Sequence, residues 1–393
     1  MSGIVLRGMT WDHPRGVDPL VKGAPAFEAA HPGVSIVWEK RSLREFGEAP
    51  LEQYAEVYDL IVVDHPFVGF AAAHPYLVDW SRALTADEKA AFAADSVGQS
   101  WPSYEYRGGV WALPLDAATQ VSSYRPDLLR AFEVGPPATF EEVLTLGRRA
   151  KARGQWIATT AFPTDAISTV ISIAANLGHP IVDETPVFLP EALGREVMQR
   201  FHALADVSHP RSTEMNPIRC YEAMVTGDDI VYCAYGYGYT NYARENPRPR
   251  LAFTDAPSHG GCGPAGTQLG GTGVAVSARS RNVDVAMDYA RWLASAEHQK
   301  GDYVRLGGQP ASLAAWTDAG NDALCGGFFS GTLETLRTAH VRPRFDGWIP
   351  LFEHAGERIT ACLRGEIADD ALLAWLNDSF ARAQDAAGVA RSA

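Results

Sequence analysis

The sequence predicts an α/β fold in which a mainly parallel sheet is flanked by helices. A short apolar run at Ile4–Leu6, a helical pattern over Val21–Ala30 and a second apolar run at Val34–Trp38 form a βαβ opening. Much later, a glycine turn at 270–273 leads into a short strand and then into a helix that contains Val285–Leu293. The chain has 393 residues, which is long enough for two lobes with separate cores.

The first half of the chain places polar side chains where predicted strands end. The first strand runs into a polar turn over 8–16, and a third strand over Tyr58–Val63 runs into another polar loop. Ligands of open parallel sheets bind outside the carboxyl ends of the strands. The candidate residues that follow these two strands are Trp11, Asp12, His13, Asp64 and His65.

After about residue 137 the chain alternates predicted strands and helices, and it ends in helices. The predicted strands are 156–161 and 230–235, and the predicted helices are 169–177, 193–205, 220–226, 333–338, 349–363 and 369–386. Thr139 and Glu142 form a capping-box pattern that predicts the start of another helix, because each side chain satisfies a backbone N–H of the first turn.

Composition restricts the partners of the protein. Apolar residues make up 46% and charged residues 21% of the chain, which is typical of a globular protein. The net charge of −13 argues against a nucleic-acid partner, since phosphate binding requires a basic surface. No apolar run reaches the roughly 18 residues that would span a bilayer. No secretory signal precedes the first strand, so the expectation is either a removed leader or a cytoplasmic protein that starts at Met1.

The cysteine and glycine patterns predict neither a metal site nor a cofactor. The five cysteines are scattered and form no CxxC pair, so a cysteine-based metal site is not expected. Free thiols are the simpler interpretation, and one disulfide is the alternative. No GxGxxG or GxxxxGK[ST] motif follows a predicted strand, which leaves nucleotide binding without support.

The order of motifs in the last third of the chain resembles a known family. A glycine pair at Gly270-Gly271 opens a strand, and a polar loop at Ser280–Asn282 leads into an aromatic-rich helix. The segments Ser295–Lys300 and Gly307–Pro310 follow in the same order as in family 1 extracellular solute-binding proteins. These maltose-binding-protein-like proteins are the carbohydrate-binding subunits of ABC importers. The segments Leu77–Trp80, Gly108–Leu115 and Pro137–Glu142 are similar to further motifs of that family.

The resemblance implies a two-lobed periplasmic-binding-protein-like fold with a ligand cleft between the lobes. The first lobe would comprise 1–115 and 272–312, the second 116–271 and 313–393, with crossings near 116–123, 264–272 and 307–316. The protein would capture a small polar ligand, a sugar or polyol, by hinge closure. It would be a monomer that delivers the ligand to importer membrane subunits. Its location would be periplasmic or extracellular if a leader was removed.

Aromatic and carboxylate side chains are the first candidates for ligand contacts. Aromatic faces pack on sugar rings, and a tyrosine hydroxyl bonds sugar hydroxyls, which favours Tyr235 and Tyr237 within the tyrosine-rich segment 232–242, as well as Trp11. The alternative for each is packing in a core. Among the carboxylates, those that follow a predicted strand or lie at a crossing are Asp64, Asp116 and Asp165. Their alternative role is to form turns or cap helices.

Arginines bear on the charge of the ligand. Arg41, which follows the second strand, and to a lesser degree Arg15 could clamp a carboxylate, in which case the ligand is an acid. Their alternative role is a surface salt bridge. Gly270 and Gly271 are also candidates for ligand contacts.

The two Asp-His-Pro loops keep an enzyme on the same fold as an alternative. In that alternative, His13 and His65 act as acid and base, and Asp12 or Asp64 orients them.

Overall fold

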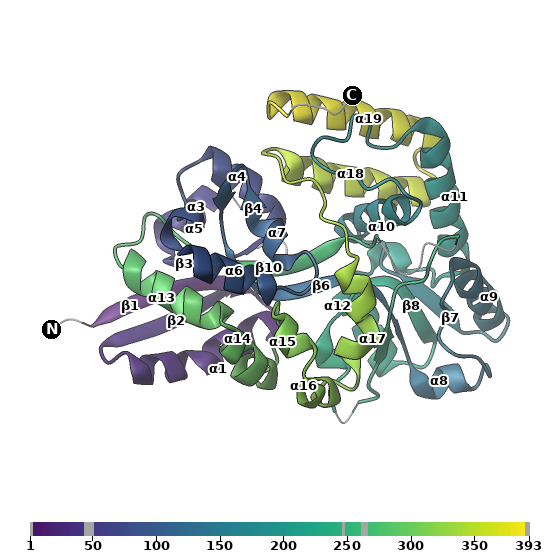
Figure 1. The fold of residues 1–393 in the computed structure, drawn as a ribbon. Coiled ribbons are helices and arrows are strands. Elements are labelled where there is room, and N and C mark those ends of the chain that lie inside the picture. The colour runs from purple at the N-terminus through teal and green to yellow at the C-terminus, as the bar shows by residue number, and fades with distance from the viewer. Residues whose placement is uncertain (1–2, 43–50, 246–247, 261–265, 390–393) are drawn as a thin grey trace. The chain divides into compact units, whose positions relative to one another are not determined.

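The computed structural model describes residues 3–42, 51–245, 248–260 and 266–389, which fold into two compact units (Figure 1). The first unit comprises Met1–Ala118, Tyr239–Asn241 and Gly270–Leu324. The second comprises Thr119–Gly238, Tyr242–Leu269 and Cys325–Ala393. The last division, after Leu324, lies beyond the crossing expected near 307–316. Residues 264 and 265 of the expected second crossing lie outside the described residues.

The first unit is built on a sheet whose strands follow the order β2-β1-β3-β10. These strands are β1 (Ile4–Trp11), β2 (Val34–Arg41), β3 (Leu60–Asp64) and β10 (Leu269–Val276). β1 runs parallel to both β2 and β3, whereas β10 is antiparallel to β3. Helix α1 (Pro14–Ala30) joins β1 to β2, so the predicted βαβ opening is confirmed.

The polar turn predicted over 8–16 is wrong, because β1 continues to Trp11 and α1 begins at Pro14. Gly8, in this segment, leaves space for the Trp38 side chain. A Cβ on Gly8 would lie 2.5 Å from the Trp38 ring of the neighbouring strand. A glycine within a strand thus marks close packing here, although the same residue is a common turn signal.

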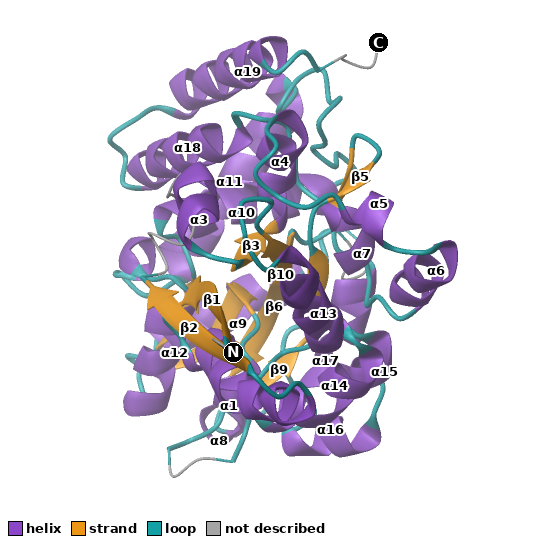
Figure 2. Ribbon diagram, turned by 90° about the vertical axis from the view of Figure 1, so that its left-hand side faces the viewer, coloured by secondary structure: helices purple, strands orange, loops and turns teal. Residues whose placement is uncertain are grey.

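Short helices and a long amphipathic one complete the first unit (Figure 2). The long helix α13 (Val283–Ala294) buries Ala286, Tyr289 and Leu293, as its apolar periodicity predicts. Asn282 stands at its N-cap position, although its side chain makes no capping hydrogen bond. The remaining elements are α3 (Leu51–Val57), η1 (His65–Phe67), α4 (Val68–Ala73), α5 (Trp80–Ala83), α6 (Ala86–Ala94), α7 (Ser100–Tyr104), β4 (Glu105–Tyr106), β5 (Gly109–Val110), α14 (Ala296–His298), η4 (Gln299–Tyr303), α15 (Leu313–Trp316) and α16 (Ala319–Leu324).

The second unit is built around β8 (Ile230–Tyr237). β8 pairs antiparallel with β6 (Leu113–Tyr124) and parallel with β7 (Trp156–Thr159), and β9 (Ala252–Thr254) is antiparallel to β6. β6 begins in the first unit and ends in the second, so one continuous strand carries the chain from one unit to the other.

Helices that include the C-terminal pair surround the second sheet. They are α8 (Pro126–Arg130), α9 (Phe140–Lys151), α10 (Pro163–Asn176), α11 (Glu191–Val207), η2 (Ser212–Glu214), α12 (Pro217–Thr226), η3 (Thr240–Tyr242, at the division between the units), α17 (Phe328–Arg337), α18 (Trp348–Leu363) and α19 (Asp369–Ala386). The last helix has the bounds that the sequence predicts. Helix α10 is buried along most of its length and packs on α18, with Ile167, Ile171 and Ala174 inside the core.

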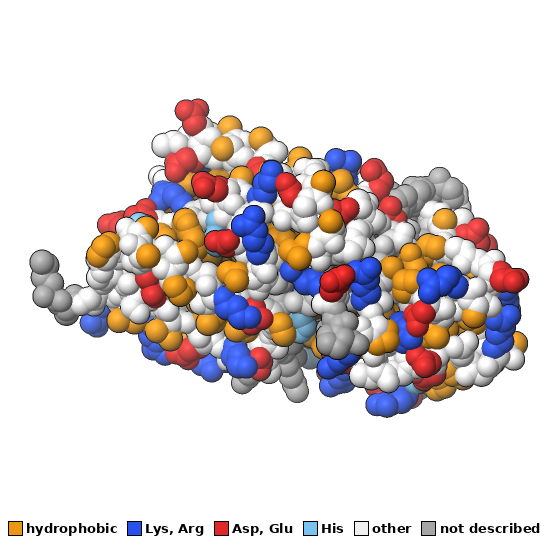
Figure 3. Space-filling view, turned by 90° about the horizontal axis from the view of Figure 1, so that it is seen from below, with side chains coloured by type: hydrophobic (Ala, Val, Ile, Leu, Met, Phe, Trp, Pro, Cys, Tyr) orange, Lys and Arg blue, Asp and Glu red, His pale blue; other side chains and the backbone are white. Residues whose placement is uncertain are grey.

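The surface contains charged side chains of both signs. On the face drawn in Figure 3, acidic and basic side chains are interspersed. Among the described residues, no helix combines the length and the apolar composition that a membrane crossing requires.

Candidate functional site

The loop after β1 is packed against the first turn of α1. Trp11 is buried, and a Cβ on Gly16 would lie 2.5 Å from its ring, so glycine is required for the helix to cover the indole. Asp12 points outward and pairs with Lys40 at 2.8 Å, where both side chains are more than half exposed. Of these two candidates, only Asp12 offers its side chain to solvent.

His13 ends the same loop as the N-cap of α1. Its Nδ1 accepts a hydrogen bond from the backbone N–H of Arg15 at 3.1 Å, and its ring packs edge-on against Tyr239 at 4.8 Å between centroids. Burial, followed by the nearby Arg15 charge, lowers the pKa of His13 to about 4. The imidazole is therefore neutral at pH 7 and serves as a capping acceptor.

Asp116 faces Arg15 within the first unit. Nε of Arg15 donates to Oδ2 of Asp116 at 2.7 Å, and Nη2 donates to Oδ1. The guanidinium carbon also lies 4.5 Å from the centroid of the Tyr239 ring. Burial alone would lower the pKa of Arg15, but the Asp116 carboxylate outweighs it and raises that pKa. Both oxygens of Asp116 are occupied by this fork, so Asp116 acts here as an internal partner.

The loop after β3 contains one accessible carboxylate and one inaccessible ring. Oδ1 of Asp64 accepts a hydrogen bond from the His65 backbone at 2.8 Å and lies 3.1 Å from Nδ1 of the His65 ring. The Asp64 side chain is 30% exposed, whereas His65 is fully buried. The Asp64 carboxylate is thus partly open to solvent, whereas the His65 ring is part of the interior.

Arg41 and the glycine pair border the same sheet. Arg41 is partly exposed, and its Nη2 donates to the Tyr58 hydroxyl at 2.6 Å. Gly271 has a φ of 99°, and a Cβ there would lie 2.2 Å from the carbonyl oxygen of Asp116. The pair Gly270-Gly271 therefore lets β10 pass close to the β6 backbone.

Asp165 lies in the first turn of α10 in the second unit and is 5% exposed. Burial raises the pKa of its carboxyl to about 8, so the group is largely protonated at neutral pH. A neutral carboxyl can both donate and accept a hydrogen bond.

The two chosen tyrosines have different surroundings. Tyr235 is 1% exposed, and its hydroxyl meets Nε2 of His259 at 2.5 Å and the Pro257 carbonyl at 3.2 Å. Its hydroxyl is thus enclosed in the core, as the packing alternative predicts. Tyr237 is partly exposed, and its hydroxyl receives a hydrogen bond from Nε2 of Gln268 at 2.7 Å. Of the two, Tyr237 is the one that is partly open to solvent.

Gln268 and Ser168 complete a polar group around Tyr237. Nε2 of Gln268 also donates to Oγ of Ser168 at 3.0 Å. The other amide atom, Oε1, is buried and has no hydrogen-bond partner among the described residues. A buried acceptor without a partner is costly, so this oxygen is suited to a donor supplied by water or ligand. Asp165 precedes Ser168 by one turn of α10, and we call these two residues together with Tyr237 and Gln268 the α10 polar group.

Three residues that contact the candidate side chains were not predicted from the sequence: Ser168, Gln268 and Tyr239. Ser168 lies three residues after Asp165, on the same face of α10. Gln268 stands directly before the strand that contains the glycine pair. Tyr239 was part of the tyrosine-rich segment, but nothing in the local pattern indicated that it would cover Arg15 and His13. Helical spacing could have identified Ser168, whereas the contacts of the other two are non-local.

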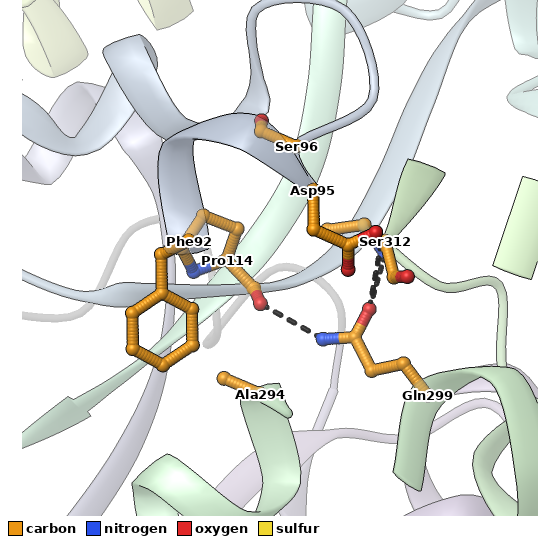
Figure 4. Close-up of a pocket in the computed structure, with 8 residues that line it drawn as sticks. Phe92, Asp95, Ser96, Pro114, Ala294, Gln299 and Ser312 are labelled. Carbon is orange, nitrogen blue, oxygen red and sulfur yellow. Dashed lines mark hydrogen bonds between the residues drawn. The ribbon is translucent and has the colours of Figure 1, made fainter. Parts of the chain in front are cut away.

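A small pocket lies within the first unit and is lined by residues that include Phe92, Pro114 and Gln299 (Figure 4). Its volume of about 10 Å³ accommodates a single water molecule. Gln299 on its wall donates to the Pro114 carbonyl at 3.0 Å and accepts from the backbone N–H groups of Ala311 and Ser312, each at 2.8 Å. The side chain therefore holds the chain after Gly307–Pro310 in place.

Residues 24–319 match the model of the bacterial extracellular solute-binding protein family. The chain belongs to this family. It is also 26% identical to a probable ABC transporter-binding protein of Deinococcus radiodurans, over 84% of this chain and 81% of the relative. Membership implies a periplasmic or extracellular location.

Solved structures of similar fold include proteins with sugar and polyol ligands. The maltose-bound T. maritima MalE3 matches with a TM-score of 0.81 at 16% identity, covering 96% of this chain and 99% of that one. An ABC transporter solute-binding protein of Agrobacterium radiobacter K84 in complex with ribitol matches with a TM-score of 0.78 at 20% identity, covering 97% and 99%. The two-lobed α/β fold class predicted from the sequence is confirmed.

The enzyme alternative loses its support. The family match indicates capture of a solute. The buried His65 ring cannot reach a substrate, and the His13 nitrogen Nδ1 is occupied as a helix cap. Both histidines of the two Asp-His-Pro loops are thus buried.

Proposed function

We propose that this protein is the solute-binding subunit of an ABC importer and that its ligand is a neutral sugar or polyol. The observation that carries the proposal is the family match over residues 24–319. The maltose and ribitol bound by structurally similar proteins support this class of ligand. The partners would be the ligand and the importer's membrane subunits, and the protein would act as a monomer.

The α10 polar group is the proposed contact set of the second unit. It combines a hydroxyl, an amide oxygen that lacks a partner and a carboxyl whose pKa is raised to about 8 by burial. Such groups donate and accept hydrogen bonds without a net charge, which matches the hydroxyls of a polyol. The Tyr237 ring adds an apolar surface for C–H groups.

In the first unit, the proposed contacts are side chains at the ends of the strands that are exposed or partly exposed. Asp12 and Asp64 accept hydrogen bonds from sugar hydroxyls, and Arg41 is the cation available to an acidic ligand. Binding would shift the protein toward a closed state by a hinge motion at the chain crossings.

The test is calorimetric titration with maltose, ribitol, other neutral sugars and polyols, and sugar acids. Tyr237→Phe removes one ligand-facing hydroxyl and should weaken binding about tenfold. Tyr242→Phe is the matched control, because its hydroxyl bonds Glu222 at 3.1 Å, and it should bind as wild type does. Binding of sugar acids alone would contradict the neutral ligand and indicate Arg41. Equal affinities of wild type and Tyr237→Phe would remove Tyr237 from the site.

A further inference from the structure

Three helices of the second unit bring together side chains that are far apart in the sequence. His202 comes from α11, Cys362 from α18 and Asp369 from the first turn of α19. These helices pack on one another, and Figure 1 shows them along one side of the unit. Sequence spacing gave no sign of this cluster, because 160 residues separate its histidine from its cysteine (362 − 202).

The ligand atoms of the three side chains converge. Nε2 of His202 lies 2.9 Å from Oδ1 of Asp369, and Sγ of Cys362 lies 3.0 Å from the same oxygen. All three atoms lie within 4.8 Å of one another. Cys362 is 1% exposed, whereas the side chains of His202 and Asp369 are 34% and 39% exposed. The cluster therefore has a buried sulfur at its base and an opening toward solvent.

We propose that His202, Cys362 and Asp369 form a binding site for a zinc-class divalent cation. Thiolate, imidazole and carboxylate are each zinc donors, and three protein ligands leave a fourth position for water. Usual zinc bond lengths of roughly 2.0–2.3 Å give ligand-to-ligand separations of about 3.3–3.7 Å at a tetrahedral centre. The separations from Asp369 would have to open by only about half an ångström, which side-chain rotation can supply.

The cation would replace the hydrogen bonds that now join the cluster. The Cys362 thiol donates to Asp369, and burial followed by this hydrogen bond raises its thiol pKa to about 12. Metal binding would convert the thiol to a metal-bound thiolate and release one proton to solvent. The carboxylate of Asp369 would then bind the metal through the oxygen that now accepts both hydrogen bonds.

The surrounding charges are compatible with a cation. Arg195, which also lies on α11, is paired with Glu191 at 2.9 Å and with Asp370 at 3.2 Å. Because the site contains one residue from each of three helices, a bound metal would link α11, α18 and α19 only in the folded chain. The proposal is independent of the sugar or polyol ligand, since none of its residues belongs to the α10 polar group.

The experiment titrates metal-free protein with Co²⁺, whose absorption reports both thiolate ligation and tetrahedral geometry, and then displaces it with Zn²⁺. We expect one Co²⁺ per chain, with a thiolate-to-cobalt charge-transfer band that Zn²⁺ abolishes. Cys362→Ser should remove the band, and His202→Gln and Asp369→Asn should each weaken binding at least about tenfold. His209→Ala is the matched control: its imidazole lies 3.6 Å from Asp229 without a thiol, and it should bind as wild type does.

A second readout guards against variants that fail to fold. His202 is partly exposed, so His202→Gln should keep the melting temperature of the metal-free protein and show a smaller rise with Zn²⁺ than wild type does. Absence of the charge-transfer band in folded wild type, or an unchanged band in Cys362→Ser, would overturn the proposal. A Zn²⁺-dependent rise as large in His202→Gln as in wild type would place the metal elsewhere.

Discussion

The ion pair of Arg15 and Asp116 shows how one residue's surroundings decide its role. The carboxylate lies at the sequence position expected for a ligand contact, yet it is 2% exposed and held by the guanidinium fork. Burying two charges costs hydration free energy, and their mutual attraction offsets this cost only while both charges are present. Asp116 therefore contributes to the integrity of the first unit, and its removal leaves Arg15 as an unpaired buried charge.

Asp116→Asn should destabilise the protein by about 3–5 kcal/mol, because the guanidinium loses its counter-charge in a buried site. Urea unfolding followed by tryptophan fluorescence measures this loss. Asp12→Asn is the matched control, since it makes the same change in the exposed pair with Lys40 and should cost less than about 1 kcal/mol. Similar losses in the two variants would contradict the internal role of Asp116.

Buried histidines make stability depend on pH. Burial lowers the pKa of His298 to about 4, and His13 and His259 are lowered to about 4 and about 3. Between about pH 6.5 and pH 4 the unfolded chain binds protons that the folded chain does not, so stability falls as pH falls through this window. Above about pH 6.5 both states are neutral at these positions, and the contribution is complete.

His298→Gln should flatten this dependence by up to about 3 kcal/mol across the window, because the variant has no imidazole to protonate in the unfolded state. His298 suits the test because it packs on Trp292, at 3.8 Å between ring centroids, and belongs to no proposed ligand contact. Urea midpoints of wild type and variant, measured at several pH values across the window, give the two slopes. Parallel slopes would contradict the predicted role of His298.

Elements whose signals are local were predictable from the sequence. The capping box of Thr139 and Glu142 forms in both directions at the start of α9, and α19 has the predicted bounds. In contrast, the crossing expected near 116–123 was not predicted to be a strand, yet β6 runs through it to Tyr124. Its buried Gln120 bonds Thr169 and Ser172 of α10, and contacts between distant segments are invisible to a local pattern.

The same distinction applies to the candidate site. The strand ends predicted two loops at one edge of the sheet, because β1 and β3 are parallel. That these loops contact a ligand stays a prediction. The strand ends could not indicate that His65 would turn inward or that Gln268 would approach Tyr237. Both outcomes depend on packing against other segments of the chain. Gln268 and Tyr237, for example, are 31 residues apart in the sequence.

The glycine pair of β10 permits a close approach of two strands, which leads to a prediction for Gly271. Gly271→Ala should destabilise the protein, because its Cβ would lie 2.2 Å from a backbone oxygen that cannot move aside. Gly33→Ala is the matched control, since its φ of 93° is similar but nothing lies within 4 Å of its Cβ. The loss at Gly271 should exceed that at Gly33 by at least about 2 kcal/mol in urea unfolding. Equal losses would mean that backbone conformation, and not close approach, requires the glycine.

For the whole molecule, chain connectivity makes each unit depend on distant segments. The first unit draws on three separate stretches of chain, and β10, which pairs with β3, comes from the last of them. Residues Tyr239–Asn241 also belong to it and bring Tyr239 onto Arg15. Neither unit can therefore form from a single continuous piece of the sequence.

A fragment that ends at Ala118 should consequently remain unfolded, because β3 would lose its neighbour β10 and leave an apolar strand edge open. Joining 1–118 to 270–324 through a flexible linker of about ten residues restores that strand and should yield a folded unit. It should be less stable than the intact protein, since Tyr239 no longer covers the Arg15–Asp116 pair. Near-ultraviolet circular dichroism distinguishes the two chains, because only packed aromatic side chains give a structured signal. A native-like signal from 1–118 alone would show that β10 is dispensable for the first unit.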